Sequence, residues 1–210
     1  MPMRRRCGLL VAVLLSLLCS ARTVAGDAPG RFDYWVLSLS WSPEYCQANV
    51  GDEQCRQHYA FVVHGLWPQY ERGYPSRCAR RERVPKPLIA RMLPLMPSEA
   101  LIQHEWDTHG SCSGLSQEDY FALVERVRRK IEIPAEYREA EDYLSTSADA
   151  IERSFIRDNR DFDRDGIAVQ CHGRYLREVR MCFDTDLQPR ACGRDVDDRC
   201  RDQVVLRPNR

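Results

Sequence analysis

Ten cysteines restrict the fold of this 210-residue sequence more than any other feature. Two of them, Cys7 and Cys19, lie in an apolar N-terminal segment, and the other eight follow residue 45. An even number of cysteines in an exported chain favours a disulfide framework, here of four bridges. A cluster of metal thiolates would need closely spaced C-x-x-C pairs, and the sequence has none. The eight candidates for disulfides are Cys46, Cys55, Cys78, Cys112, Cys171, Cys182, Cys192 and Cys200.

Residues 1–26 have the pattern of a secretory signal peptide. Arg4, Arg5 and Arg6 form a basic end, an almost entirely apolar run follows, and small residues precede Asp27. The apolar run is too short to span a bilayer comfortably. We therefore expect cleavage after Ala25 or Gly26 and export without a membrane anchor, to the periplasm or the medium, or to a vacuole or lysosome in a eukaryotic cell.

Residues 27–210 are long enough for one domain with a substantial core. No internal repeat, low-complexity tract or long linker divides them, so we expect a single-domain monomer. Without the four arginines upstream of Asp27, 27 basic side chains face 31 acidic ones. With this balance the protein has no overall positive charge, so a polyanionic partner must be bound by local contacts rather than attracted by the electrostatic field of the whole protein.

Strands at both ends of the chain with helices between them predict an α+β fold, with helices packed against an antiparallel sheet. The first predicted strand covers 34–41 and ends at Ser42-Pro43, and the second covers 59–63 and stops before Gly65 and Pro68. The other predicted elements are strands over 167–171 and 175–183 and helices over 99–109, 116–131 and 148–159.

The stretch "HEWDTHGSC", residues 104–112, follows an N-cap at Ser98 and precedes a helix end at Gly110, where a left-handed residue is favoured. His104 and His109 are five residues apart, which separates them by roughly 140° around a helix. They cannot chelate one zinc ion as an i, i+4 pair does. His104 with Thr108, and Glu105 with His109, form two adjoining i, i+4 rows that can border one cleft. Such a cleft suits proton transfer, and we expect neither a metal ion nor another cofactor.

A second motif, "HGLWP" at residues 64–68, places a histidine beside a glycine at the end of a β-rich run. The two motifs together resemble the active-site segments of the ribonuclease T2 family, which includes the plant self-incompatibility S-ribonucleases. The similarity extends to "VLSLSWSPEYC" before the first motif and to the spaced cysteines near the C-terminus, and little matches between Arg77 and Met96. The resemblance implies an exported endoribonuclease that cleaves single-stranded RNA, not DNA, without a metal ion.

The resemblance also implies a role for each motif residue. RNA carries its own nucleophile, the ribose 2′-hydroxyl, so cleavage to 2′,3′-cyclic phosphates and then 3′-phosphates needs one base and one acid. By the resemblance His109 is the base, His64 is the acid and His104 binds phosphate. Glu105 lies near the pentacoordinate phosphorus and should favour charged imidazole rings nearby.

Thr108 departs from the family pattern, in which a lysine commonly stands at this position. If the missing cation limits the rate, Thr108→Lys should raise kcat/KM on RNA, whereas a substitute cation elsewhere would make that change neutral or harmful. The chain has only Lys86 and Lys130, so the substitute should be an arginine. The candidates from the segment between the motifs are Arg72, Arg77, Arg80, Arg81 and Arg83.

Aromatic side chains should hold the bases, because single-stranded RNA bases stack on them. Trp67 matches a base-site residue of the family, and Tyr70 and Tyr74 are further candidates. Gln69 stands where some relatives carry an acidic residue that reads the base, so the nucleobase preference stays open. The other tryptophans, Trp35, Trp41 and Trp106, should belong to the core.

Family resemblance and loop lengths together predict the disulfide pairs Cys46–Cys55, Cys78–Cys112, Cys171–Cys200 and Cys182–Cys192. Outside the motifs, "DFDRDG" at residues 161–166 begins like a calcium loop, yet His172 stands where a bidentate glutamate is needed, which favours an acidic turn. His58 and His172 should have structural or surface roles.

Two other function classes stay open. One is a disulfide-bonded RNA-binding protein of this fold with weak or no catalysis, which Thr108 favours. The other is a zinc hydrolase that uses some of the same histidines. RNA digestion separates the first from a ribonuclease, and resistance to EDTA separates the second.

Overall fold

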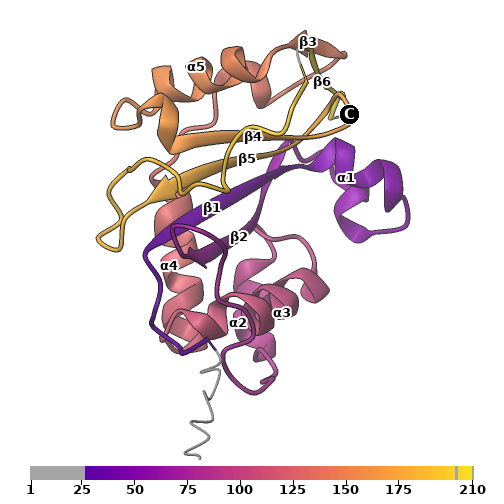
Figure 1. The fold of residues 1–210 in the computed structure, drawn as a ribbon. Helices are drawn as coiled ribbons and strands as arrows, with labels where there is room; N and C mark the ends of the chain where they lie inside the picture. The colour runs from indigo at the N-terminus through magenta and orange to yellow at the C-terminus, as the bar shows by residue number, and fades with distance from the viewer. Residues whose placement is uncertain (1–26, 202, 210) are drawn as a thin grey trace, which may run out of the picture.

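A six-stranded sheet forms the centre of the fold in the computed structural model, which describes residues 27–201 and 203–209 (Figure 1). The strand order is β2-β1-β5-β6-β3, and β4 also pairs with β5. All pairs are antiparallel except β5 and β6, which meet in parallel at one position. The α+β prediction is confirmed, while the predicted signal segment 1–26 lies outside the described residues. The strands are β1 (Tyr34–Trp41), β2 (Phe61–Gln69), β3 (Leu144–Thr146), β4 (Ile167–His172), β5 (Tyr175–Phe183) and β6 (Val204–Leu206).

Buried side chains of α2, α3, α4 and α5 all belong to one hydrophobic core, which covers a single face of the sheet. Figure 1 shows α5 lying along β4, with α2, α3 and α4 gathered beyond β1 and β2. In the part of the chain that the structure describes, no helix has the length and apolar character needed to cross a membrane. The helices are α1 (Ser42–Ala48), α2 (Lys86–Met92), α3 (Glu99–Thr108), α4 (Gln117–Arg129) and α5 (Ala148–Asp158), with 3₁₀ turns at Glu53–Arg56, Gly110–Cys112, Ala135–Tyr137 and Arg164–Gly166.

The long elements follow the sequence prediction, and the differences have local causes. Strands β1 and β5 have the predicted bounds, and the Ser98 side chain caps α3 by accepting a hydrogen bond from the Leu101 amide. The prediction that β2 stops before Gly65 and Pro68 is wrong, because β2 runs to Gln69. Because β2 is an edge strand, one row of its backbone groups faces away from the sheet, and proline is tolerated in such strands.

Gly110 differs from the prediction as well. It is not left-handed but begins a 3₁₀ turn after α3. Its role is to leave space: a Cβ atom there would lie 2.7 Å from Cε3 of Trp106 and 2.8 Å from the Tyr120 ring. The short elements α1, α2, β3 and β6 were not predicted, because three to seven residues are too few to show a period.

The two faces of β1 bury different clusters, because successive side chains of a strand point to opposite faces. Trp35, Leu37, Leu39 and Trp41 belong to the main hydrophobic core. On the other face, Tyr34 and Val36 belong to a smaller cluster with Trp67, Cys182 and Val196. Trp106 is also in the main core, so the prediction for Trp35, Trp41 and Trp106 is confirmed.

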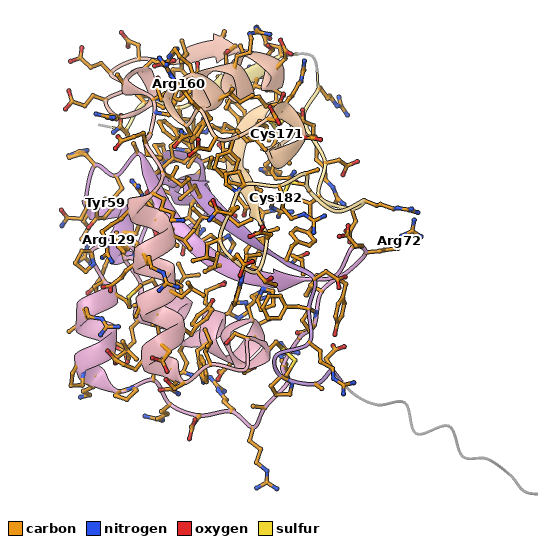
Figure 2. The ribbon with its side chains drawn as sticks, turned by 90° about the vertical axis from the view of Figure 1, so that its left-hand side faces the viewer. Tyr59, Arg72, Arg129, Arg160, Cys171 and Cys182 are labelled. Atoms are coloured by element: carbon orange, nitrogen blue, oxygen red, sulfur yellow. A yellow bond between two sulfur atoms is a disulfide. The ribbon has the colours of Figure 1, made fainter. Side chains whose placement is uncertain are left out.

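All four disulfides have the expected pairing. Cys78–Cys112 ties the segment after β2 to the end of α3. Cys171–Cys200 and Cys182–Cys192 join β4 and β5 to the segment that follows β5, and Figure 2 labels Cys171 and Cys182. These two bridges hold residues 192–200 at both ends.

Candidate active site

Three cross-strand rows on the face of the smaller cluster form the floor of the site. Each row runs from β2 across β1 to β5, and β1 contributes Val36, Ser38 and Ser40. The two serines are small, so larger side chains of β2 and β5 can meet above them. The rows are Trp67–Val36–Cys182, Gly65–Ser38–Arg180 and Val62–Ser40–Glu178.

His64 lies at a β-bulge in β2. Ser38 pairs with Gly65 and Leu39 pairs with Val63, which leaves His64 without a partner on β1. Bulges commonly redirect a side chain beside an active site. Here the imidazole reaches across β1, and its Nδ1 atom lies 3.0 Å from Oε1 of Glu178 on β5.

Helix α3 brings Glu105 against the other side of the His64 ring. The fully buried Glu105 carboxylate accepts a hydrogen bond from Nε1 of Trp67 at 2.7 Å, and its Oε1 atom lies 3.6 Å from Nε2 of His64. A Cβ atom on Gly65 would lie 2.0 Å from Oε2 of Glu105. The glycine of "HGLWP" is therefore required for the close approach of α3 to β2.

One cavity of about 350 Å³ collects the predicted catalytic side chains (hereafter the histidine cavity). Its lining includes all four of them, together with Trp67, Gln69 and Tyr74. The complete lining is Val36, His64, Trp67, Gln69, Tyr74, His104, Glu105, His109, Arg177, Glu178, Arg180, Asp195, Val196 and Arg199.

Three predicted substrate-binding residues are placed differently. Thr108 lines a neighbouring groove with His104 and Arg77, and its buried Oγ1 has no hydrogen-bond partner within the described residues. Tyr70 lies outside the cavity and donates a hydrogen bond to Oδ1 of Asp27. Trp67 lines the cavity but is only 8% exposed, because His109 and Arg180 contact its ring. Of the proposed stacking residues, Tyr74 is the exposed one.

The environments of His64 and His109 push their pKa values in opposite directions. Burial opposes protonation of His64, but the hydrogen bond to Glu178 and the charges of Glu105 and Glu178 outweigh it, so the pKa of His64 is raised above 6.5. Burial, with smaller contributions from His64 and His104, lowers the pKa of His109 to about 3. One imidazole therefore favours the charged form and the other the neutral form.

The two carboxylates around His64 also differ. Burial raises the pKa of Glu105 to about 7, so this group is only partly ionised near neutral pH. Glu178 is buried as well, but its hydrogen bond to His64 and the charges of His64, Arg180 and Arg177 lower its pKa to about 2. Glu105 raises the pKa of His64 as expected, yet Glu178 is the partner whose lowered pKa favours the ionised form. Sequence reasoning missed Glu178, because Arg177 and Arg180 lie in the same strand and no local pattern distinguishes the glutamate.

The arginines at the site are not those proposed from the sequence. Arg72 lies on a loop at the edge of the molecule (Figure 2), and Arg77 lines the groove beside His104 rather than the histidine cavity. Arg80, Arg81 and Arg83 do not line the cavity. The arginines that do are Arg177, Arg180 and Arg199.

Arg177 and Arg180 differ in freedom of movement. Arg180 donates two hydrogen bonds to Oε2 of Glu178 and lies over the Trp67 ring. Arg177 lies at a β-bulge in β5 and has no partner residue on β4, because Gln170 pairs with Glu178 and Cys171 pairs with Leu176. Its side chain is 61% exposed, and its Nε atom forms an ion pair with Oε1 of Glu178 at 3.4 Å. A ligand can therefore reach the guanidinium group from solvent.

A second cavity, of about 400 Å³, adjoins the first on the other side of His64. The two cavities share His64, Arg177 and Glu178, and Ser40 and Ser98 line the second one. A ligand that occupies both cavities must pass these three shared residues.

No group of three or more histidine, cysteine or acidic side chains suited to a metal ion occurs within residues 27–201 and 203–209. Residues 164–166 of the predicted acidic turn form a 3₁₀ turn. His58 and His172 are exposed and lie outside the histidine cavity, although His172 lines the second cavity.

Comparison with known proteins places these features in context. A family model described as the ribonuclease T2 family matches residues 32–192. A ribonuclease from Aeromonas hydrophila is 38% identical over 193 residues, which cover 84% of this chain and 83% of that protein. An RNase-related protein from Calystegia sepium has a TM-score of 0.69 at 24% identity, covering 85% of this chain and 98% of its own. RNase NT, solved in complex with 5′-AMP, has a TM-score of 0.65 at 22% identity, and the match covers 85% of this chain and 99% of that protein. At these identities the two solved structures show a shared fold.

Proposed function

The chain belongs to the ribonuclease T2 family, and we propose that this endoribonuclease cuts single-stranded RNA without a metal ion, through 2′,3′-cyclic phosphates that open to 3′-phosphates. One observation carries the proposal: His64 and His109 line one cavity, and their surroundings favour opposite charge states. General acid–base catalysis needs one proton donor and one proton acceptor at the same pH.

In the first step, His109 takes the proton of the ribose 2′-hydroxyl, and the 2′-oxygen forms a bond to phosphorus. The bond from phosphorus to the 5′-oxygen breaks, and His64 gives its proton to that oxygen. The products are a 2′,3′-cyclic phosphate and a free 5′-hydroxyl. In the second step the roles reverse: His64 takes a proton from water, and the water oxygen forms a bond to phosphorus. The bond from phosphorus to the 2′-oxygen breaks, and His109 protonates that oxygen, which leaves a 3′-phosphate.

The shared wall of the two cavities supports a binding mode for the substrate. The nucleoside that precedes the scissile phosphate occupies the histidine cavity, where His109 reaches its 2′-hydroxyl, and the following nucleoside occupies the second cavity. The phosphate then passes His64 and Arg177. His104 binds the phosphate from α3 as a hydrogen-bond donor, since burial and the nearby charges of His64 and Arg77 lower its pKa and favour the neutral ring. Preorganised donors of this kind stabilise a transition state in which negative charge develops.

Export and oligomeric state belong to the same proposal. We propose that residues 1–26 direct export and that residues 27–210 act as a monomer outside the cytosol. Four disulfides support this, because such bridges persist in oxidising compartments. Periplasmic, secreted and vacuolar locations all meet that condition.

The test is digestion of a defined single-stranded RNA in the presence of EDTA, with product ends identified by mass spectrometry. We expect cyclic phosphates first and 3′-phosphates later, with DNA of the same sequence intact. Loss of cleavage in EDTA, or release of 5′-phosphates, would favour the zinc hydrolase. RNA binding without cleavage would favour the catalytically inactive binding protein.

A further inference from the structure

One polar group in the histidine cavity has no role in the mechanism above. Asp195 lines this cavity together with Gln69, Tyr74 and Val196. We propose that Asp195 selects the nucleoside that precedes the scissile phosphate, favouring bases that carry an exocyclic amino group over uracil. The inference rests on the proposed ribonuclease function and assigns a specificity-determining residue to it.

The position of Asp195 is fixed by its surroundings. It lies between Cys192 and Cys200, the two residues of this segment that are bridged to β5 and β4. Its Oδ2 atom accepts a hydrogen bond of 2.7 Å from the amide of Gly73, so the segment after β5 is joined to the loop after β2. Asp195 can therefore turn away from the cavity only if this hydrogen bond breaks.

The other carboxylate oxygen is the informative one. Oδ1 of Asp195 is buried and has no hydrogen-bond partner among the described residues. A buried acceptor without a donor costs free energy, and an ordered water molecule or a bound ligand can supply the missing donor. A ligand that donates an N–H group to Oδ1 of Asp195 would satisfy this acceptor, which favours binding of such a ligand.

The other lining residues are suited to a planar base. Tyr74 is 54% exposed, and its ring centroid lies 5.6 Å from that of His109, so it offers an open face beside the catalytic base. Val36 and Val196 supply apolar walls, and Gln69 is buried to 4% exposure at the same cavity. Bases stack on an aromatic face of this kind without regard to sequence, so the choice among bases must come from their edges.

The chemistry of those edges sets the direction of the preference. An ionised carboxylate only accepts hydrogen bonds, whereas a glutamine amide both donates and accepts. Adenine and cytosine each present an amino group next to a ring nitrogen that accepts, which complements a carboxylate beside an amide. Uracil presents a carbonyl oxygen where cytosine has its amino group, so two acceptors would face each other.

The test uses two dinucleotides, CpA and UpA, whose first bases differ chiefly by this amino-to-carbonyl exchange. We expect the wild-type kcat/KM for CpA to exceed that for UpA by about 10-fold or more, since an unpaired buried acceptor penalises the wrong base. Asp195→Asn keeps an oxygen for the Gly73 amide and turns its –NH₂ group toward the cavity. This variant should lose or reverse the preference, while Asp197→Asn, an exposed change in the same loop, should retain it.

The outcomes separate the two proposals. Cleavage of both dinucleotides with the same ratio in wild type and Asp195→Asn overturns the role of Asp195 and leaves the ribonuclease intact. If neither dinucleotide is cleaved, the ribonuclease proposal fails. The base preference can then be measured without turnover, by calorimetric binding of cytidine and uridine 3′-phosphates. Equal affinities in wild type would then overturn the inference.

Discussion

Nδ1 of His64 lies 3.0 Å from Oε1 of Glu178, although β1 separates the two strands that carry them. The contact crosses above Ser38 and Ser40, whose small side chains leave room for it. Glu178 is in turn held by two hydrogen bonds from Arg180. In the proposed mechanism, this contact makes Glu178 a positioning residue for His64, the proposed general acid, and it leaves Nε2 as the ring nitrogen on the side of Glu105.

Replacing Glu178 with glutamine tests this role. Glu178→Gln removes a charge that raises the pKa of His64, so burial should then lower that pKa. Because kcat/KM falls as pH rises through the pKa of the acid, its alkaline limb should move to lower pH. The pH profile and an NMR titration of His64 measure the shift. Glu141→Gln, an exposed change, is the control, and a uniform loss of rate without a shift would indicate a structural role only.

The pH profile of the wild-type enzyme follows from the same two histidines. Activity should rise as His109 loses its proton, with a pKa of about 3, and fall as His64 loses its own, with a pKa above 6.5. The maximum of kcat/KM therefore lies below neutrality. Initial rates from pH 3 to pH 9, with the folded state checked by circular dichroism at each pH, would reveal it, and a steady rise from pH 6 to pH 8 would contradict the assignment.

Alanine variants separate proton transfer from binding. His64→Ala and His109→Ala should each lower kcat by about 10²-fold or more, the usual contribution of one proton-transfer group. His104→Ala should chiefly weaken binding of substrate and transition state. Steady-state kinetics on one dinucleotide compares all three, and a kcat unchanged in His109→Ala would remove it from the mechanism.

Arg177 and Thr108 form a paired prediction. Because Arg177 lies where the two cavities meet, Arg177→Gln should lower kcat/KM by about 10-fold, within the range of one lost hydrogen bond to a charged group. Thr108→Lys should change the wild-type rate little but recover activity in Arg177→Gln. The exposed variant Arg129→Gln serves as the control. A large gain from Thr108→Lys in the wild-type chain would instead show that the missing lysine limits the rate.

Gly65 offers a test of packing. The Cβ atom of Gly65→Ala would overlap the Glu105 carboxylate, and overpacking of this kind costs roughly 1–3 kcal/mol. We expect a lower Tm together with a loss of activity, since Glu105 must move. In the matched control, Gly51→Ala, the added methyl group meets no atom within 4 Å. Equal Tm values for the two variants would show that α3 can shift away from Gly65→Ala without loss of stability.

Much of the fold and site was accessible from the sequence because the relevant signals are local. Strand alternation gave the bounds of β1, a serine cap gave the start of α3, and an amphipathic pattern gave α4. The two histidine motifs supplied all four predicted catalytic residues that line one cavity. In each case, a pattern of a few adjacent residues was enough to predict the element or the candidate site residue.

The sequence alone determined the cysteine framework, the two motifs and the residues proposed to move protons. Tertiary structure decided what surrounds them: Glu178 and Arg177 are more than a hundred residues from His64 in the chain and reach it only because β5 pairs with β1. Two β-bulges then set the directions of His64 and Arg177. Strand register and bulges depend on the pairing of distant segments, and the charge state of a buried group depends on all its neighbours in space, so neither can be read from a local pattern.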